Sequence, residues 1–278
     1  MRHPRFFFLI VFAIFSGMAL SFWGGNLGHA IQRYVENEEF LVLKQKYTAD
    51  DIVEAHRKEL FGEKDASLDD VSLQFHPHLL MEVAYQTSSH RLGKGVLLWS
   101  LVDGEMVIDA SSWEKTRGFS RALQAKADFQ DFLVLNTLAR FDGELSLQRL
   151  YRELRMDKGV FLSVMQRVKD KSLVMQKDAK VSLLGLNSCF PIAPRTTIGS
   201  WFMNRSYAHA KCVKVRYSED EVQELALAAF GDRDFKIIRS SRVYIPVYNV
   251  LVRNHFDGSL DFSAWNGMTG GKETLVFD

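Results

Sequence analysis

The residues best suited to binding chemistry in this sequence lie between residues 195 and 216, where basic and aromatic side chains alternate and no acidic residue occurs. Such a pattern suits anionic lipid headgroups, nucleic acid or an acidic protein surface. A simpler interpretation is a strand with one solvated face, because Lys211–Tyr217 has period-two alternation. The candidate docking surface consists of Arg195, Trp201, Arg205, Tyr207, Lys211, Lys214 and Arg216.

Cysteine and histidine offer little metal chemistry. Cys189 and Cys212 are the only cysteines, and in an exported protein they could form a disulfide, although two buried thiols would serve packing equally well. His209 with these cysteines gives three ligands, whereas structural zinc sites have four. His76 and His78 share one face of a predicted strand without a third ligand, so we interpret them as solvated histidines and expect no metal.

Motifs of common enzymes are missing from the sequence. It contains no G-x-S-x-G elbow, no H-E-x-x-H and no G-x-G-x-x-G between a strand and a helix. Gly270-Gly271-Lys272 imitates part of a phosphate-binding loop, but Asn266 replaces its first glycine and Glu273 its Ser or Thr. We therefore expect a non-catalytic protein without a cofactor, with an exported hydrolase of unrecognised site as an alternative.

The N-terminus carries the strongest targeting signal. Phe6–Trp23 contains no charged residue, and 18 helical residues span about 27 Å, close to the hydrocarbon core of about 30 Å. Arg2 and Arg5 precede the segment, whereas Arg33 is the only basic residue in the flank that follows it, residues 24–40. The positive-inside rule then predicts a single-pass anchor with a cytoplasmic N-terminus and an exported body.

A cleaved secretory signal is the alternative for this segment. Its apolar run would be Phe6–Phe15, and Gly17-Met18-Ala19 would form the small-residue cleavage site. The mature protein would then be secreted or periplasmic. Both interpretations export the rest of the chain.

Composition narrows the class of protein further. The 278 residues are 47% hydrophobic and 25% charged, and 18 Gly, 5 Pro and 2 Cys exclude disordered, collagen-like and disulfide-dense classes. The net charge of +1 hides an acidic stretch, since Glu36–Asp70 holds 11 acidic and 5 basic residues. Within this stretch, the residues from Thr48 to about Leu60 predict a helix that is ended by Gly62. We favour a solvated helix face over an acidic docking surface.

Two regions have the alternation of β-strands. Val71–Tyr85 is apolar at every second position except Pro77, which predicts a half-buried strand broken or edged there. Val96–Ala110 predicts a hairpin with a type I′ turn at Asp103-Gly104, which would set Trp99 opposite Ile108.

The C-terminal part predicts a helix over Glu219–Phe230 and a second hairpin. A three-residue loop, Phe256–Gly258, would set Phe262 opposite Val252 and place Gly258 in a left-handed conformation.

Residues 129–186 form the clearest module. Apolar stripes predict three short helices, the second beginning after Ser146 and the third after Asp157, and a hairpin turning at Lys177-Asp178 follows them. This order resembles a winged-helix domain, a helix-turn-helix variant, over about a fifth of the chain.

The resemblance implies that the third helix would be the DNA-recognition helix. Residues 144–180 hold 9 basic and 5 acidic residues, a modest excess, and export would separate the module from DNA. A protein-contact role is therefore preferred over DNA readout. The candidate recognition residues are Lys158, Gln166, Arg167, Lys169 and Lys171.

These patterns together predict an α+β chain of five parts. They are an anchor or signal (1–24), an α+β domain containing a hairpin (36–123), the winged-helix-like module (126–187), a linker (188–200) and a C-terminal domain of a helix and an antiparallel sheet (201–278). We expect a membrane-anchored protein that binds other proteins or anionic envelope components, with nucleic acid less favoured. The second function class is a winged-helix DNA-binding regulator with a cytoplasmic body.

Overall fold

The computed structural model describes residues 39–62, 66–87, 91–184, 193–199, 202–206, 210–231 and 234–273. These ranges contain seven helices, a ten-stranded mixed sheet and a three-stranded antiparallel sheet, which confirms the predicted α+β class. None of these helices has the length and apolar character needed to cross a membrane. The predicted anchor, residues 6–23, lies outside the described residues.

The chain divides into two compact units, each assembled from stretches that are distant in sequence. Unit 1 comprises Met1–Phe75, Gly199–Val213 and Val243–Leu275, and unit 2 comprises His76–Ile198, Lys214–Arg242 and Val276–Asp278. The long strands β2 (Ala66–Gln86) and β11 (Lys236–Asn254) contribute residues to both units.

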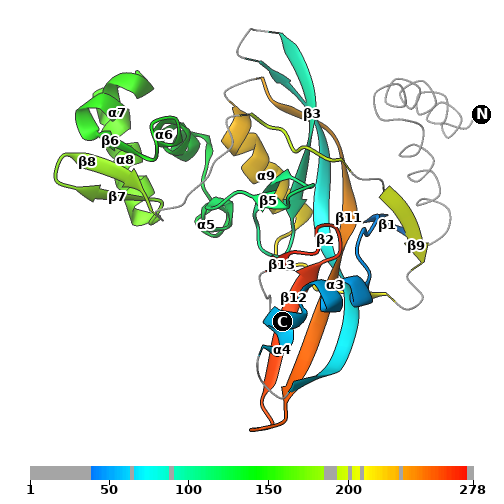
Figure 1. The fold of residues 1–278 in the computed structure, drawn as a ribbon. Coiled ribbons are helices and arrows are strands. Elements are labelled where there is room, and N and C mark those ends of the chain that lie inside the picture. Colours follow the sequence, from blue (N-terminus) through cyan, green and yellow to red (C-terminus); the bar gives the residue numbers. More distant parts are fainter. Residues whose placement is uncertain are drawn as a thin grey trace, which may run out of the picture. The chain divides into compact units, whose positions relative to one another are not determined.

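Unit 1 is built on the C-terminal part of β11. Strand β1 (Glu39–Leu43) pairs with it in parallel and with β9 (Phe202–Ser206) antiparallel (Figure 1). Strand β11 also pairs with β12 (Leu260–Asn266), which pairs with β13 (Lys272–Glu273), and β2 is the neighbour of β11 on the side opposite β12. Strand β10 (Lys211–Cys212) pairs in parallel with β2. The core includes Ile52, Tyr248, Val250, Val252 and Trp265.

The predicted first helix forms as two helices in unit 1. Helix α3 (Ala49–Ala55) begins after Thr48, whose side chain forms a capping box with Asp51. Helix α4 (Arg57–Phe61) follows, because His56 leaves helical geometry, and it ends at Gly62, where φ is 58°.

The β11–β12 hairpin corrects the predicted register by one residue. Phe262 lies opposite Leu251 rather than Val252, and the loop has four residues between Asn254 and Ser259. The Asn254 carbonyl accepts from the backbone N–H of Gly258, and the Asn254 side chain accepts from that of Phe256. These side-chain and backbone bonds favour the longer loop. Gly258 has a φ of 71°, as predicted.

Unit 2 contains a sheet of β2, β3 (Leu92–Ser100), β4 (Met106–Asp109) and β5 (Glu114–Lys115). The side chains of Leu79, Met81 and Val83 are fully buried, as the alternation predicts. Strand β2 runs through Pro77, so of the two predicted alternatives the break there is wrong. The pairing of β2 with β3 begins at His78, the residue after Pro77. Helices α5 (Phe119–Gln124) and α9 (Glu219–Phe230) share this core, and Ser218 caps α9.

The β3–β4 hairpin also differs from its prediction, by two residues. Trp99 lies opposite Met106, and no type I′ turn forms, because Gly104 has a positive φ whereas Asp103 does not. Leu101 leaves the ladder: its N–H donates to the Pro77 carbonyl and its carbonyl accepts from Arg216. The Leu101 side chain is thereby buried completely.

Residues 128–184, called the helix–hairpin module from here on, belong to unit 2. It contains α6 (Phe129–Ala139), α7 (Leu147–Leu154) and α8 (Lys158–Asp170), shown in green in Figure 1. Strands β6 (Glu144–Ser146), β8 (Lys180–Leu183) and β7 (Val174–Lys177) pair in that order. Its apolar side chains form one cluster with the β2–β4 core, so the module packs as part of unit 2.

Candidate binding surfaces

Helix α8 separates a buried face from a polar face of low charge. Phe161, Val164, Met165 and Val168 are buried, as their spacing predicts. At 100° per residue, the centre of the opposite face contains Gly159, Ser163, Gln166 and Asp170, all exposed, and Leu162 and Arg167 flank it on its two sides. Leu162 is 54% exposed, and Gln166 donates to the Asp170 carboxylate at 2.7 Å. The centre of this face therefore contains no basic side chain, and the exposed apolar side chain of Leu162 lies at its margin.

Two of the predicted recognition residues bind a buried carboxylate. Arg167 Nε donates to Asp131 Oδ1 at 2.7 Å, and Lys171 Nζ donates to Asp131 Oδ2 at 2.7 Å. Asp131 lies on α6 and has no solvent exposure. Burial alone would raise its pKa, but Lys171, the backbone N–H of Asp128 and Arg167 hold that pKa below its ordinary value. These two cations thus fix α8 to α6.

Of the other recognition candidates, Lys158 is exposed at the start of α8 and Lys169 is half-buried near its end. The Asp131 pairing was not foreseen, because the partners are 36 and 40 residues apart in sequence. An acidic residue within a predicted helix of mostly apolar side chains is the only signal that could have indicated it.

The predicted basic docking surface is distributed over both units. Arg205 and Lys211 belong to unit 1, and Arg195, Lys214 and Arg216 belong to unit 2. The Arg205 guanidinium lies over the Phe75 ring, 5.8 Å from its centroid, whereas the other four side chains are exposed. Trp201, Tyr207 and His209 lie outside the described residues, so a single continuous surface stays a prediction.

The predicted disulfide likewise stays a prediction. Cys212 is exposed and lies in β10. From Cys212 to Tyr217 the side chains alternate between exposed and more buried positions. Its proposed partner, Cys189, is outside the described residues.

His78 corrects the interpretation of both histidines as solvated. It is 2% exposed, because β2 is covered on both faces there, and its Nδ1 lies 3.0 Å from the His76 carbonyl oxygen. Burial, together with the Lys115 ammonium, lowers the pKa of His78 to about 3. Its Nε2 and the Trp113 Nε1 are buried without a hydrogen-bond partner in the described part of the chain. The same part contains no group of three or more residues that could hold a metal.

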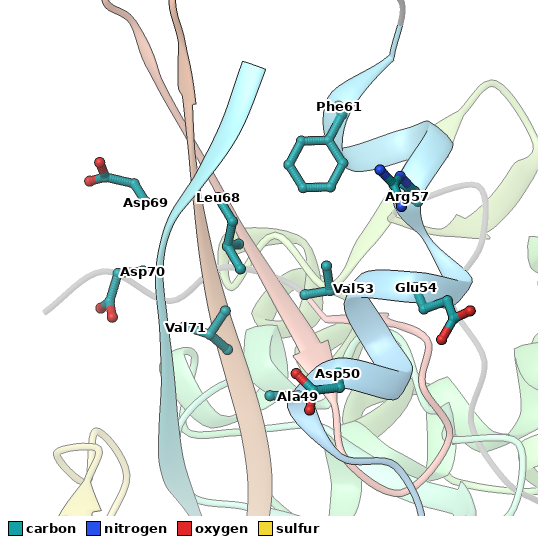
Figure 2. Close-up of a pocket in the computed structure, with 10 residues that line it drawn as sticks. All are labelled: Ala49, Asp50, Val53, Glu54, Arg57, Phe61, Leu68, Asp69, Asp70 and Val71. Atoms are coloured by element: carbon teal, nitrogen blue, oxygen red, sulfur yellow. The ribbon is translucent and has the colours of Figure 1, made fainter. Parts of the chain in front are cut away.

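Unit 1 contains a groove of about 700 Å³ between helices α3–α4 and the start of β2. Figure 2 shows Leu68 and Val71 directed from the strand toward the helices, where Val53 and Phe61 lie opposite. The lining residues are Ala49, Asp50, Val53, Glu54, Arg57, Phe61, Leu68, Asp69, Asp70 and Val71.

Carboxylates border this groove on both sides. Asp50 and Glu54 project from α3, whereas Asp69 and Asp70 project from the other side of the strand (Figure 2). Arg253 of β11 makes a two-pronged ion pair with Asp69 at 2.8 and 3.1 Å, which lowers the pKa of Asp69. The acidic stretch seen in the sequence thus contributes both borders of the groove.

Comparisons with family models, curated proteins and solved structures give no match for this chain. Its candidate functions therefore rest on these surfaces and on the N-terminal sequence.

Proposed function

We propose that this chain is a single-pass, membrane-anchored, non-catalytic protein whose exported body binds other proteins or envelope components. Support for the anchor comes from the uncharged segment Phe6–Trp23 and from the basic residues that precede it. We further propose that the helix–hairpin module is a winged helix. Its order of helix, strand, two helices and two strands is the one expected of that domain.

The observation that carries the proposed binding role is the character of the exposed face of α8. Leu162 lies exposed at the margin of this face, whose centre contains Ser163, Gln166 and Asp170, while Arg167 and Lys171 neutralise Asp131. Tight DNA binding by phosphate neutralisation uses about 6–10 phosphate contacts. A face with so few available cations is better suited to a protein surface, so the DNA-binding regulator is the weaker candidate.

A photo-reactive amino acid placed at Leu162 of the full chain tests this role in intact cells. We expect a discrete covalent adduct with another protein, which is not formed from the same group at Gln148, an exposed position on α7. An adduct with nucleic acid, or the same products from both positions, would contradict the proposal.

A DNA-binding assay separates the two function classes independently. The full chain should show no salt-dependent affinity for duplex DNA. Tight binding that is lost when Lys158 and Lys169 are changed to glutamate would instead support the regulator.

A further inference from the structure

We propose that the groove between α3–α4 and β2 is a second binding site, whose ligand is a peptide segment of a partner protein that carries both lysine or arginine and apolar side chains. This site is formed within unit 1, by residues other than those of the α8 face in unit 2. Its occupancy therefore does not depend on the proposed role of α8.

The apolar floor of the groove is the first argument. Ala49, Phe61 and Val71 pack against the core of unit 1, and Leu68 beside them is 43% exposed. A volume of about 700 Å³ is within the range of about 300–1,000 Å³ for ligand sites. An apolar ligand side chain placed here would extend a core that is already packed.

The charges on α3 are the second argument, and they specify the ligand. Asp50 and Glu54 are four residues apart on one helix face, where like charges repel each other. Neither has an ion-pair or hydrogen-bond partner among the described residues. The helix dipole stabilises Asp50 in the first turn but not Glu54 one turn later. Two uncompensated carboxylates beside an apolar floor complement a cationic segment.

Arg57 and Arg253 do not remove this negative charge. Arg253 is already paired with Asp69, and Arg57 is the only basic side chain among the described residues that line the groove. Asp50 and Glu54 therefore outnumber it, and the described lining keeps a net negative charge for an incoming lysine or arginine.

Binding of synthetic peptides to the full chain in zwitterionic lipid nanodiscs tests the proposal, with empty discs as the lipid control. An amphipathic lysine–leucine peptide should bind, whereas a lysine–serine peptide of the same length and charge and a glutamate–leucine peptide should not. Changing Asp50→Asn together with Glu54→Gln should weaken binding roughly tenfold. Leu68→Ser should also weaken it.

Helix α9 provides the matched control. Asp220 and Glu224 are exposed and have the same positions relative to their N-cap, Ser218, as Asp50 and Glu54 have relative to Thr48. Asp220→Asn with Glu224→Gln removes the same charge and should leave binding unchanged. The proposal would be overturned if both double variants lost the same affinity for the lysine–leucine peptide, or if the lysine–serine peptide bound equally well. Binding of the lysine–leucine peptide to the empty discs alone, or its failure to bind the full chain, would also overturn it.

Discussion

At the scale of single residues, Asp131 is the buried charge whose partners determine the position of α8. It has no exposure, whereas Arg167 and Lys171 are 34% and 23% exposed. Breaking a buried ion pair typically costs about 3–5 kcal/mol, because an uncompensated charge remains. Here both cations can regain part of their hydration, so the cost should be lower.

Asp131→Asn should therefore lower the free energy of unfolding by about 2–3 kcal/mol. Because folding lowers the pKa of Asp131, its stabilisation is fully present above the ordinary value of 3.8 and is lost as the pH falls through the lower pKa of the folded state. Urea unfolding at neutral pH and near pH 3 checks both statements. An Asp170→Asn control should change little, and an Asp131 variant as stable as wild type would contradict this role.

His78 should make stability depend on mildly acidic pH. Its pKa is about 3 in the folded protein and near 6.5 in the unfolded chain, so the unfolded state binds more protons between these values. Its contribution is present above pH 6.5 and is lost as the pH falls toward 3, with a slope of at most about 1.4 kcal/mol per pH unit. His78→Leu should remove this slope in unfolding curves at pH 7, 5.5 and 4.5. If the free energies of unfolding of the wild type and of the His78→Leu variant changed equally with pH, the lowered pKa of His78 would be contradicted.

At the scale of elements, two glycines with the same backbone conformation differ in their surroundings. Gly104 and Gly258 have φ of 78° and 71°. A Cβ on Gly104 would lie 2.8 Å from the Tyr217 ring and 3.2 Å from the Ser120 Cα, whereas nothing lies within 4 Å of one on Gly258. The β3–β4 turn therefore combines a left-handed residue with close packing.

Gly258→Ala should cost about 1 kcal/mol, the cost of the left-handed conformation alone. Gly104→Ala should cost about 2–4 kcal/mol, because the surrounding side chains must also move. Urea unfolding of the two variants measures the difference. Equal losses would show that the packing around Gly104 contributes nothing.

The elements also show which features could be predicted from sequence. Helix ends at Thr48 and Ser146 are local features, and capping residues with apolar periodicity indicated them. The β3–β4 register was wrong because distant residues set it: the backbone of Leu101 bonds Pro77 and Arg216 instead of continuing the ladder. The β11–β12 register was wrong because Asn254 bonds Phe256 and Gly258 within a longer loop.

The same limit applies to the candidate sites. The acidic stretch before Asp70 was visible in the sequence, but its arrangement as a groove depends on Leu68 and Val71 facing α3–α4. The burial of His78 depends on both faces of β2 being covered, and the neutralisation of Arg167 depends on Asp131 of another helix. None of these contacts leaves a periodic pattern.

At the scale of the whole molecule, a net charge of +1 conceals a separation of charge. Four acidic residues of the stretch, Asp50, Glu54, Asp69 and Asp70, line the unit 1 groove, whereas three of the basic candidates, Arg195, Lys214 and Arg216, belong to unit 2. In the proposed function, the N-terminal segment determines which compartment, and therefore which partners, these surfaces encounter. Membrane sidedness is thus the property on which the proposed function depends most.

A topology reporter fused after Asp278 tests this central claim most directly. A phosphatase that matures only outside the reducing cytoplasm should be active in this fusion, and a fluorescent protein that matures only in the cytoplasm should remain dark. Replacing Arg2 and Arg5 with glutamate should reduce the phosphatase signal, because the positive-inside rule assigns to these residues the retention of the N-terminus in the cytoplasm. A bright cytoplasmic reporter with an inactive phosphatase would contradict the exported body and favour the DNA-binding regulator.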